Sequence, residues 1–224
     1  SRKFINDYPV VLSTTYSLKN CLNANVMYDY VIVDEASQVD LCTGALALAS
    51  AKKAVIVGDL KQLPNVVDSQ SAKQTDRIFS QYKLEEAYRY KNHCLLSSVT
   101  ELFKKAPTTL LKEHYRCHPK IIEFCNRKFY NNELVILSDV KTDRIPLVLC
   151  YTIEGNHSRN NYNQRQIDII TDEIIPKYNL CLDDNSLGIV TPYRNQTNAL
   201  QSTFRGTTVK ADTVDKFQGR ENKV

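Results

Sequence analysis

The stretch YDYVIVDEASQVD, residues 28 to 40, places an apolar run directly ahead of two adjacent carboxylates, Asp34 and Glu35. A short apolar run bounded by polar residues predicts a strand that is buried on both faces, as in a parallel sheet covered by helices. Two like charges at the end of such a strand repel each other, so we expect a cation or a proton in transit beside them. The stretch therefore predicts both a buried strand and a reactive strand end.

Similar short apolar runs recur along the chain, separated by longer amphipathic stretches. The further runs are PVVLST at 9–14, KAVIVGD at 53–59, TTLLKE at 108–113, PLVLCY at 146–151 and LGIVTP at 187–192. Residues 119–130 and 162–178 have the apolar spacing of helices, and Pro119 suits a first helical turn. Alternating strands and helices predict an α/β fold with parallel sheets flanked by helices.

The stretch KKAPTT, residues 104 to 109, separates two groups of predicted strands. A basic pair followed by a proline is typical of a connection between domains. We therefore expect a first lobe over residues 1–106 and a second over residues 107–224.

The composition of the 224 residues is that of an ordinary globular protein, with a formal net charge of +4. This mild positive charge is compatible with a polyanionic partner but does not identify one. No apolar run reaches the roughly 18 residues that span a membrane, and the first residues lack the apolar core of a signal peptide. The seven cysteines form no CxxC pair, which favours reduced thiols in the cytoplasm.

Polar residues stand at the ends of several predicted strands, where ligands of open α/β sheets collect. Ser13, Thr14 and Thr15 end the first run, Asp34 and Glu35 end the second, and Gly58 and Asp59 end the third, with Gln62 shortly after. An apolar strand that ends in Asp–Glu is the pattern of a Walker B element. Taken alone, such a pair is also found as a helix cap or a solvated turn.

Several motifs in a fixed order strengthen the Walker B interpretation. They are VIVDEASQ at 31–38, VIVGDLKQLPN at 55–65, HYRCHPKIIEFCNRKFY at 114–130, GIVTPYRNQ at 188–196 and TVDKFQGRE at 213–221. In these residues and their order the chain resembles the superfamily 1 helicases of the 5′-to-3′ branch, in the group related to the nonsense-mediated-decay helicase and senataxin. The resemblance covers residues 9 to 224 and implies RecA-like parallel sheets of the P-loop NTPase fold, in two partial lobes.

The resemblance implies that the chain uses ATP and Mg²⁺. Asp34 would be the carboxylate associated with Mg²⁺, and Glu35 would be the general base. Gln62 would contact the γ-phosphate or the attacking water, and Arg116 would reach the transferring phosphoryl group, a role that suits a permanently charged, bidentate side chain. The alternatives are that Gln62 simply caps a loop and that Arg116 forms a structural ion pair.

The same resemblance implies contacts to nucleotide and to nucleic acid. Glu221 would lie near the ribose, with Gly219 allowing a tight turn. Contacts to single-stranded DNA or RNA would come from Thr14, Thr15, Thr191, Pro192 and Tyr193. They would be mainly to the backbone, with stacking on Tyr193. The two threonines could also be ordinary strand-end hydroxyls, and Tyr193 could be a core or surface residue.

The segment around Arg116 also offers zinc ligands, namely His114, Cys117, His118 and Cys125. Their spacing matches no common zinc pattern, and the resembling family has no metal there. We expect instead that His118 packs ahead of Pro119 at the start of a helix.

No G-x-x-x-x-G-K-[ST] loop, the phosphate cradle of P-loop enzymes, occurs in these 224 residues. The last motif of the family is also absent. The chain is then either a piece of a longer helicase, which we favour, or a degenerate relative. Either way we expect the 224 residues alone to hydrolyse almost no ATP and to self-associate at exposed sheet edges.

The interpretation that we favour is an ATP-dependent 5′-to-3′ helicase or translocase that hydrolyses ATP between two RecA-like lobes. One alternative is a nucleic-acid-dependent ATPase that remodels protein–nucleic-acid complexes without unwinding. Another is a non-catalytic nucleic-acid-binding module that kept only the fold.

Overall fold

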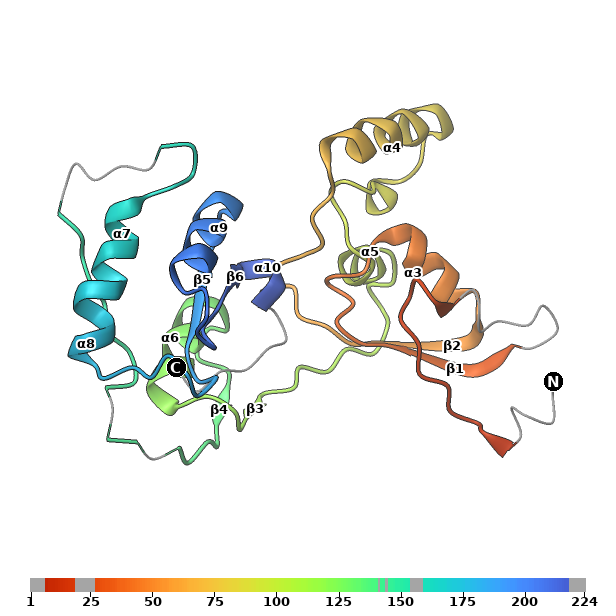
Figure 1. The fold of residues 1–224 in the computed structure, drawn as a ribbon. Coiled ribbons are helices and arrows are strands. Elements are labelled where there is room, and N and C mark those ends of the chain that lie inside the picture. The colour runs from red at the N-terminus through yellow and green to blue at the C-terminus, as the bar shows by residue number, and fades with distance from the viewer. Residues whose placement is uncertain (1–6, 19–26, 141, 144, 154–158, 218–224) are drawn as a thin grey trace. The chain divides into compact units, whose positions relative to one another are not determined.

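The computed structural model describes residues 7–18, 27–140, 142–143, 145–153 and 159–217. The chain forms two compact units, residues 1–140 and residues 141–224, and each is described by itself (Figure 1). The lobe boundary expected near residue 106 stays a prediction.

The first unit combines parallel strand pairs with helices. Its described elements are β1 (Tyr28–Val33), α3 (Leu41–Leu48), β2 (Ala51–Ile56), α4 (Ser69–Tyr82), the 3₁₀ helix η1 (Glu86–Tyr88), α5 (Leu95–Leu102), β3 (Glu113–His114), α6 (Pro119–Phe129) and β4 (Val135–Ile136). β1 pairs in parallel with β2, and β3 pairs in parallel with β4. This confirms the mixed α/β class with parallel pairing.

The core of the first unit lies at the carboxyl end of β1, which contributes Val33. Val33, Ala36, Ala47 and Leu95 form one buried cluster, to which α3 and α5 each contribute a residue. Helix α3 begins at a cap, because the Asp40 carboxylate accepts hydrogen bonds from the amides of Cys42 at 2.9 Å and Thr43 at 3.0 Å. The core thus fixes the two helices against the end of β1.

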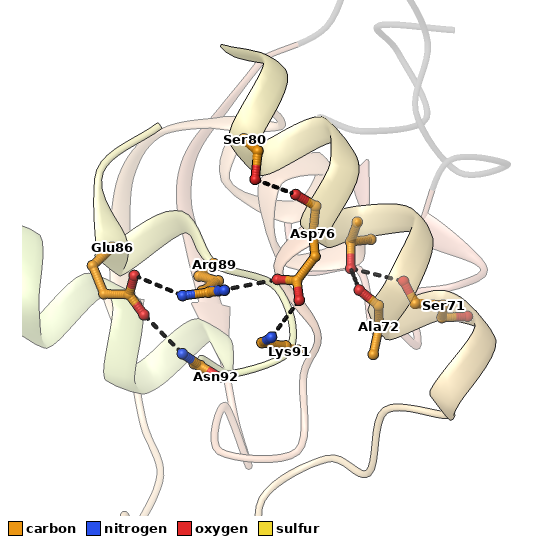
Figure 2. Close-up of polar contacts among 9 residues, drawn as sticks. Ser71, Ala72, Asp76, Ser80, Glu86, Arg89, Lys91 and Asn92 are labelled. Atoms are coloured by element: carbon orange, nitrogen blue, oxygen red, sulfur yellow. Dashed lines mark hydrogen bonds and ion pairs between the residues drawn. The ribbon is translucent and has the colours of Figure 1, made fainter. Parts of the chain in front are cut away.

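Helix α4 has no buried residue and is tied to the segment after it by charged side chains. Asp76 of α4 forms ion pairs with Lys91 and, at 3.0 Å, with Arg89 (Figure 2). Arg89 also lies 3.4 Å from Glu86, which in turn accepts from Asn92 at 2.7 Å. The bond from Lys91 and then that from Arg89 lower the pKa of Asp76, so the carboxylate stays charged.

The second unit repeats the pattern of parallel strands and helices around a separate core. Its described elements are α7 (Gln164–Ile169), the π-helix η2 (Ile170–Ile174), α8 (Ile175–Lys177), β5 (Gly188–Thr191), α9 (Arg194–Thr203), β6 (Lys210–Thr213) and α10 (Val214–Phe217). β5 and β6 pair in parallel, and Ile167, Leu200, Phe204 and Ala211 form the buried cluster. The expected helix over 162–178 is therefore confirmed as a continuous helical stretch with a π-helical middle.

The strands expected at 9–14 and 146–151 do not form, and that at 108–113 reaches only its last residue, which begins β3. Leu12 is 93% exposed, Leu111 is 78% exposed and Leu149 is 73% exposed. The prediction of buried strands at 9–14 and 146–151 is wrong, because a strand also needs a neighbouring strand for its backbone groups, which an apolar pattern does not encode. Among the described residues no strand is paired with 9–14 or 146–151, whereas at the end of 108–113 Lys112 O accepts from the Val135 amide at 2.8 Å.

No helix among the described residues is long and apolar enough to cross a membrane.

Candidate functional site

The acidic pair and the loop that contains Gln62 follow adjacent strands at the same sheet edge. Val33 at the end of β1 is paired with Ile56 at the end of β2. The pairing continues past both strands, since the Val57 amide donates to Val33 O at 2.8 Å and the Ala36 amide donates to Val57 O at 2.9 Å. Because the strands are parallel, the residues after them share one edge of the sheet.

Glu35 has an unusual backbone, with a φ of 49° in the left-handed region. Residues with a side chain rarely adopt this region, and such strain is concentrated at functional sites. The turn is held by the Asp34 carboxylate, which accepts from the Glu35 amide at 2.9 Å, and by the Gln38 amide, which donates to Glu35 O at 2.8 Å. Both acidic residues are exposed, so their carboxylates can meet a ligand.

Gly58 lets the two strand ends approach closely. A Cβ at this position would lie 3.0 Å from the Ala36 amide nitrogen and 3.1 Å from that of Ser37. The turn after Glu35 therefore packs directly on the backbone of the loop that leads to Gln62. Ser37 is 1% exposed, and its hydroxyl finds no hydrogen-bond partner among the described residues.

Asp59 organises the loop of Gln62. Its Oδ1 accepts from the Lys61 amide at 2.8 Å, and its Oδ2 accepts from Gln62 Nε2 at 3.4 Å. The same Oδ2 also accepts from the hydroxyl of Tyr130, just after α6. Gln62 itself is exposed on this loop, and its side-chain amide points toward Asp59.

Arg116 lies in the short turn between β3 and α6, and its side chain is exposed. The turn is closed by His114, whose Nε2 accepts from the Cys117 amide at 2.9 Å. Burial and then the Arg116 charge lower the pKa of His114, which favours the neutral ring that this bond needs. His118 caps α6 by accepting from the Lys120 amide at 3.2 Å, ahead of Pro119 in the first turn, as expected.

The described residues include no group of three or more side chains placed to hold a metal ion. In the segment considered for zinc, His114 Nε2 and His118 Nδ1 accept hydrogen bonds from backbone amides.

The residues expected at the nucleic acid lie in both units. In the first unit, the Thr14 hydroxyl accepts from the Ser17 amide at 3.2 Å, so it caps a turn. In the second, Thr191 ends β5 and is buried, and its hydroxyl accepts from the Tyr193 amide at 3.4 Å. Thr15 is half-buried, Pro192 is exposed, and Tyr193 is 47% exposed at the cap of α9. Gly219 and Glu221 lie outside the described residues.

The sequence did not single out Tyr130 or Ser37 as part of this site. Tyr130 is the last residue of the motif HYRCHPKIIEFCNRKFY. Its place just after the predicted helix that follows Arg116 is the feature of the sequence that could have pointed to it. Ser37 directly follows the acidic turn, but nothing in a sequence announces a buried hydroxyl without a partner.

Parallel α/β units with an acidic turn and a GDxxQ loop at adjacent strand ends define the class of RecA-like, P-loop NTPase-type domains. Residues 92–224 and residues 1–70 each match a family described as an AAA domain, and the chain belongs to this family. Named relatives confirm the resemblance to superfamily 1 helicases of the group related to the nonsense-mediated-decay helicase and senataxin.

Three relatives illustrate the likeness. The chain is 30% identical over 201 residues to "Uncharacterized ATP-dependent helicase MG140" of Mycoplasma genitalium, which covers 87% of the chain and 17% of that protein. It is 27% identical over 226 residues to "Helicase sen1" of Schizosaccharomyces pombe, and this match covers 90% of the chain and 12% of that protein. It is 26% identical over 261 residues to "Probable RNA helicase armi" of Drosophila melanogaster, and this match covers 99% of the chain and 22% of that protein. The chain thus spans a minor part of the length of these relatives.

Proposed function

We propose that the chain is the motor part of an ATP-dependent helicase or translocase that moves 5′ to 3′ on single-stranded DNA or RNA. ATP would be hydrolysed between two RecA-like lobes, and the cycle would open and close them along the strand. The observation that supports this most directly is the shared edge of β1 and β2, where the acidic turn packs on the loop of Gln62.

The exposed carboxylates of Asp34 and Glu35 are the oxygen donors that suit Mg²⁺, which, when bound, would neutralise charge on the phosphates of ATP. In this proposal Asp34 holds the hydrated ion and Glu35 takes the proton of the attacking water. Gln62 orients that water or the γ-phosphate, and Arg116 stabilises the charge that develops on the transferring group. The strained backbone of Glu35 supports a positioned rather than an incidental carboxylate.

The proposed contacts to the strand come from Thr14, Thr15, Thr191, Pro192 and Tyr193. The exposed half of the Tyr193 ring can stack on a base, a contact that does not depend on sequence. Thr14 and Thr191 use their hydroxyls in local caps, so these two would act through the backbone that they fix. Gly219 and Glu221 complete the proposal as residues near the ribose.

ATP turnover by the complete gene product, measured with and without single-stranded nucleic acid, tests the function. Glu35→Gln should lower kcat by about 100-fold or more, because it removes a general base. Glu85→Gln, at an exposed position outside the site, is the matched control and should leave kcat unchanged. Equal turnover in wild type and Glu35→Gln would sink the assignment.

Strand displacement distinguishes the finer alternatives. An enzyme that hydrolyses ATP but separates no duplex would be a remodelling ATPase, and one without turnover that still binds single strands would be a binding module. Comparing DNA with RNA, and 5′ with 3′ overhangs, decides substrate and direction.

The 224 residues studied alone should hydrolyse almost no ATP, because they contain no phosphate-binding loop. A cytoplasmic location is also proposed, because the cysteines are odd in number and scattered along the sequence.

Self-association is the last part of the proposal. Among the described residues β1 pairs only with β2, in a two-stranded sheet, and an open sheet edge can add a strand from another chain. Light scattering that shows a strict monomer at high concentration would count against it.

A further inference from the structure

The hydroxyl of Tyr130 links the end of α6 to the loop of Gln62. It donates to Asp59 Oδ2 across 71 positions of sequence, within the first compact unit. The same oxygen accepts from Gln62 Nε2 at 3.4 Å, which is the long end of a hydrogen bond. The tyrosine and the glutamine therefore donate to the same oxygen, and the phenol helps to orient the Asp59 carboxylate.

Tyr130 is held firmly enough to do this. Its amide donates to Asn126 O at 3.1 Å, and its own carbonyl accepts from the Glu133 amide at 2.8 Å. Asn126 is 7% exposed, and its side chain bonds both the amide and the carbonyl of Leu134, at 3.0 Å and 3.2 Å. The phenol thus projects from a backbone that is fixed on both sides.

Asp59 passes this constraint on to Gln62. Besides the side-chain contact, the Gln62 amide donates to Asp59 O at 3.2 Å, and the Lys61 amide occupies Asp59 Oδ1 at 2.8 Å. The Lys61 amide donates to Oδ1, whereas the Gln62 side chain and the phenol both donate to Oδ2. At 3.4 Å the bond from Gln62 Nε2 to Asp59 is a weak one, so the amide can exchange this contact for one to a phosphate or a water.

We propose that Tyr130 is a positioning residue that, through Asp59, sets the side-chain amide of Gln62 and couples it to α6, the helix that starts after Arg116. The inference deepens the proposed function and rests on it. Burial, and then the bond to Asp59, raise the pKa of Tyr130, so the phenol remains a donor at neutral pH.

The contact is tested without nucleotide by NMR of the 224-residue chain with labelled glutamine side chains. Tyr130→Phe and Asp59→Asn should both shift the Gln62 Nε2 resonances. Tyr82→Phe, at a 66% exposed phenol of α4, should not. A Gln62 resonance that is the same in wild type and in both variants, while all melt cooperatively, would overturn the proposal.

The role is tested by ATP turnover of the complete gene product. Tyr130→Phe should lower kcat about tenfold with KM unchanged, because a small misplacement of a positioned group costs rate rather than binding. A purely structural role would lower the melting temperature and leave kcat per folded molecule unchanged. Absence of turnover in the wild type would overturn the proposed function itself, whereas turnover of Tyr130→Phe equal to wild type would overturn the positioning role alone.

Discussion

At the scale of single residues, Glu35 shows a conflict between stability and the chemistry proposed for it. Its φ of 49° raises the conformational free energy of a residue with a side chain but not that of glycine. Glu35→Gly should therefore raise the free energy of unfolding by about 1 kcal/mol relative to Glu35→Gln, although neither variant retains the carboxylate.

Glu85 is the matched control for this comparison, because its φ of −66° is already favourable. There glycine should lower stability, since it only adds freedom to the unfolded chain. Chemical denaturation of both pairs of variants measures the effect. A Glu35→Gly protein less stable than Glu35→Gln would show that the left-handed turn is not strained.

His114 makes the turn of Arg116 sensitive to pH. Its folded-state pKa is lowered from 6.5, first by burial and then by Arg116, and its Nε2 must be unprotonated to accept the Cys117 amide. At low pH the unfolded chain therefore binds a proton that the folded chain resists. Stability should be full above about pH 6.5 and fall as pH drops from there toward the folded-state pKa.

Melting temperatures between pH 8 and pH 5 check this, with His114→Gln as the comparison. The variant should lose the part of the pH dependence that His114 causes. An unchanged pH profile in His114→Gln would contradict the assignment.

At the scale of elements, α4 is attached by charge rather than by burial. Asp76 holds Arg89 and Lys91, and no residue of the helix is buried (Figure 2). Asp76→Asn should therefore speed backbone hydrogen exchange over residues 69–82 and leave exchange in α3 and α5 unchanged. Asp183→Asn, the same change at an exposed position, is the control.

Added salt should act in the same direction as Asp76→Asn, because it screens partly exposed ion pairs. The lowered pKa of Asp76 also means that the attachment is present at neutral pH and is lost only well into acid, below the ordinary aspartate value of 3.8. Exchange over α4 that is indifferent to salt and to the substitution would show that packing, not charge, holds the helix.

The elements also show what a sequence can and cannot predict. β1, β2 and β5 were predictable, because each run is apolar and meets a parallel partner in its own unit. The runs at 9–14 and 146–151 are also apolar, but among the described residues no strand pairs with them, and composition does not encode strand pairing. Likewise, Asp34 and Gln62 could be placed at strand ends by pattern, whereas the Tyr130–Asp59 bond spans 71 positions and depends on how α6 packs.

At the scale of the whole molecule, the two compact units have separate buried clusters, one around Leu95 and one around Leu200. Each leucine is nearly inaccessible, at 3% and 1% exposure. Truncating either to alanine should cost about 2–5 kcal/mol through lost burial and a residual cavity. Because no residue belongs to both clusters, the cost should stay within the unit that is changed.

Leu95→Ala and Leu200→Ala therefore form a reciprocal pair, each the control of the other. Hydrogen exchange should rise in β1, α3 and α5 for Leu95→Ala, and in α7, α9 and β6 for Leu200→Ala, with no change in the other unit. Equal loss of protection in both units from either substitution would mean that they unfold as one. Two separate responses would mean that each unit can change its stability alone.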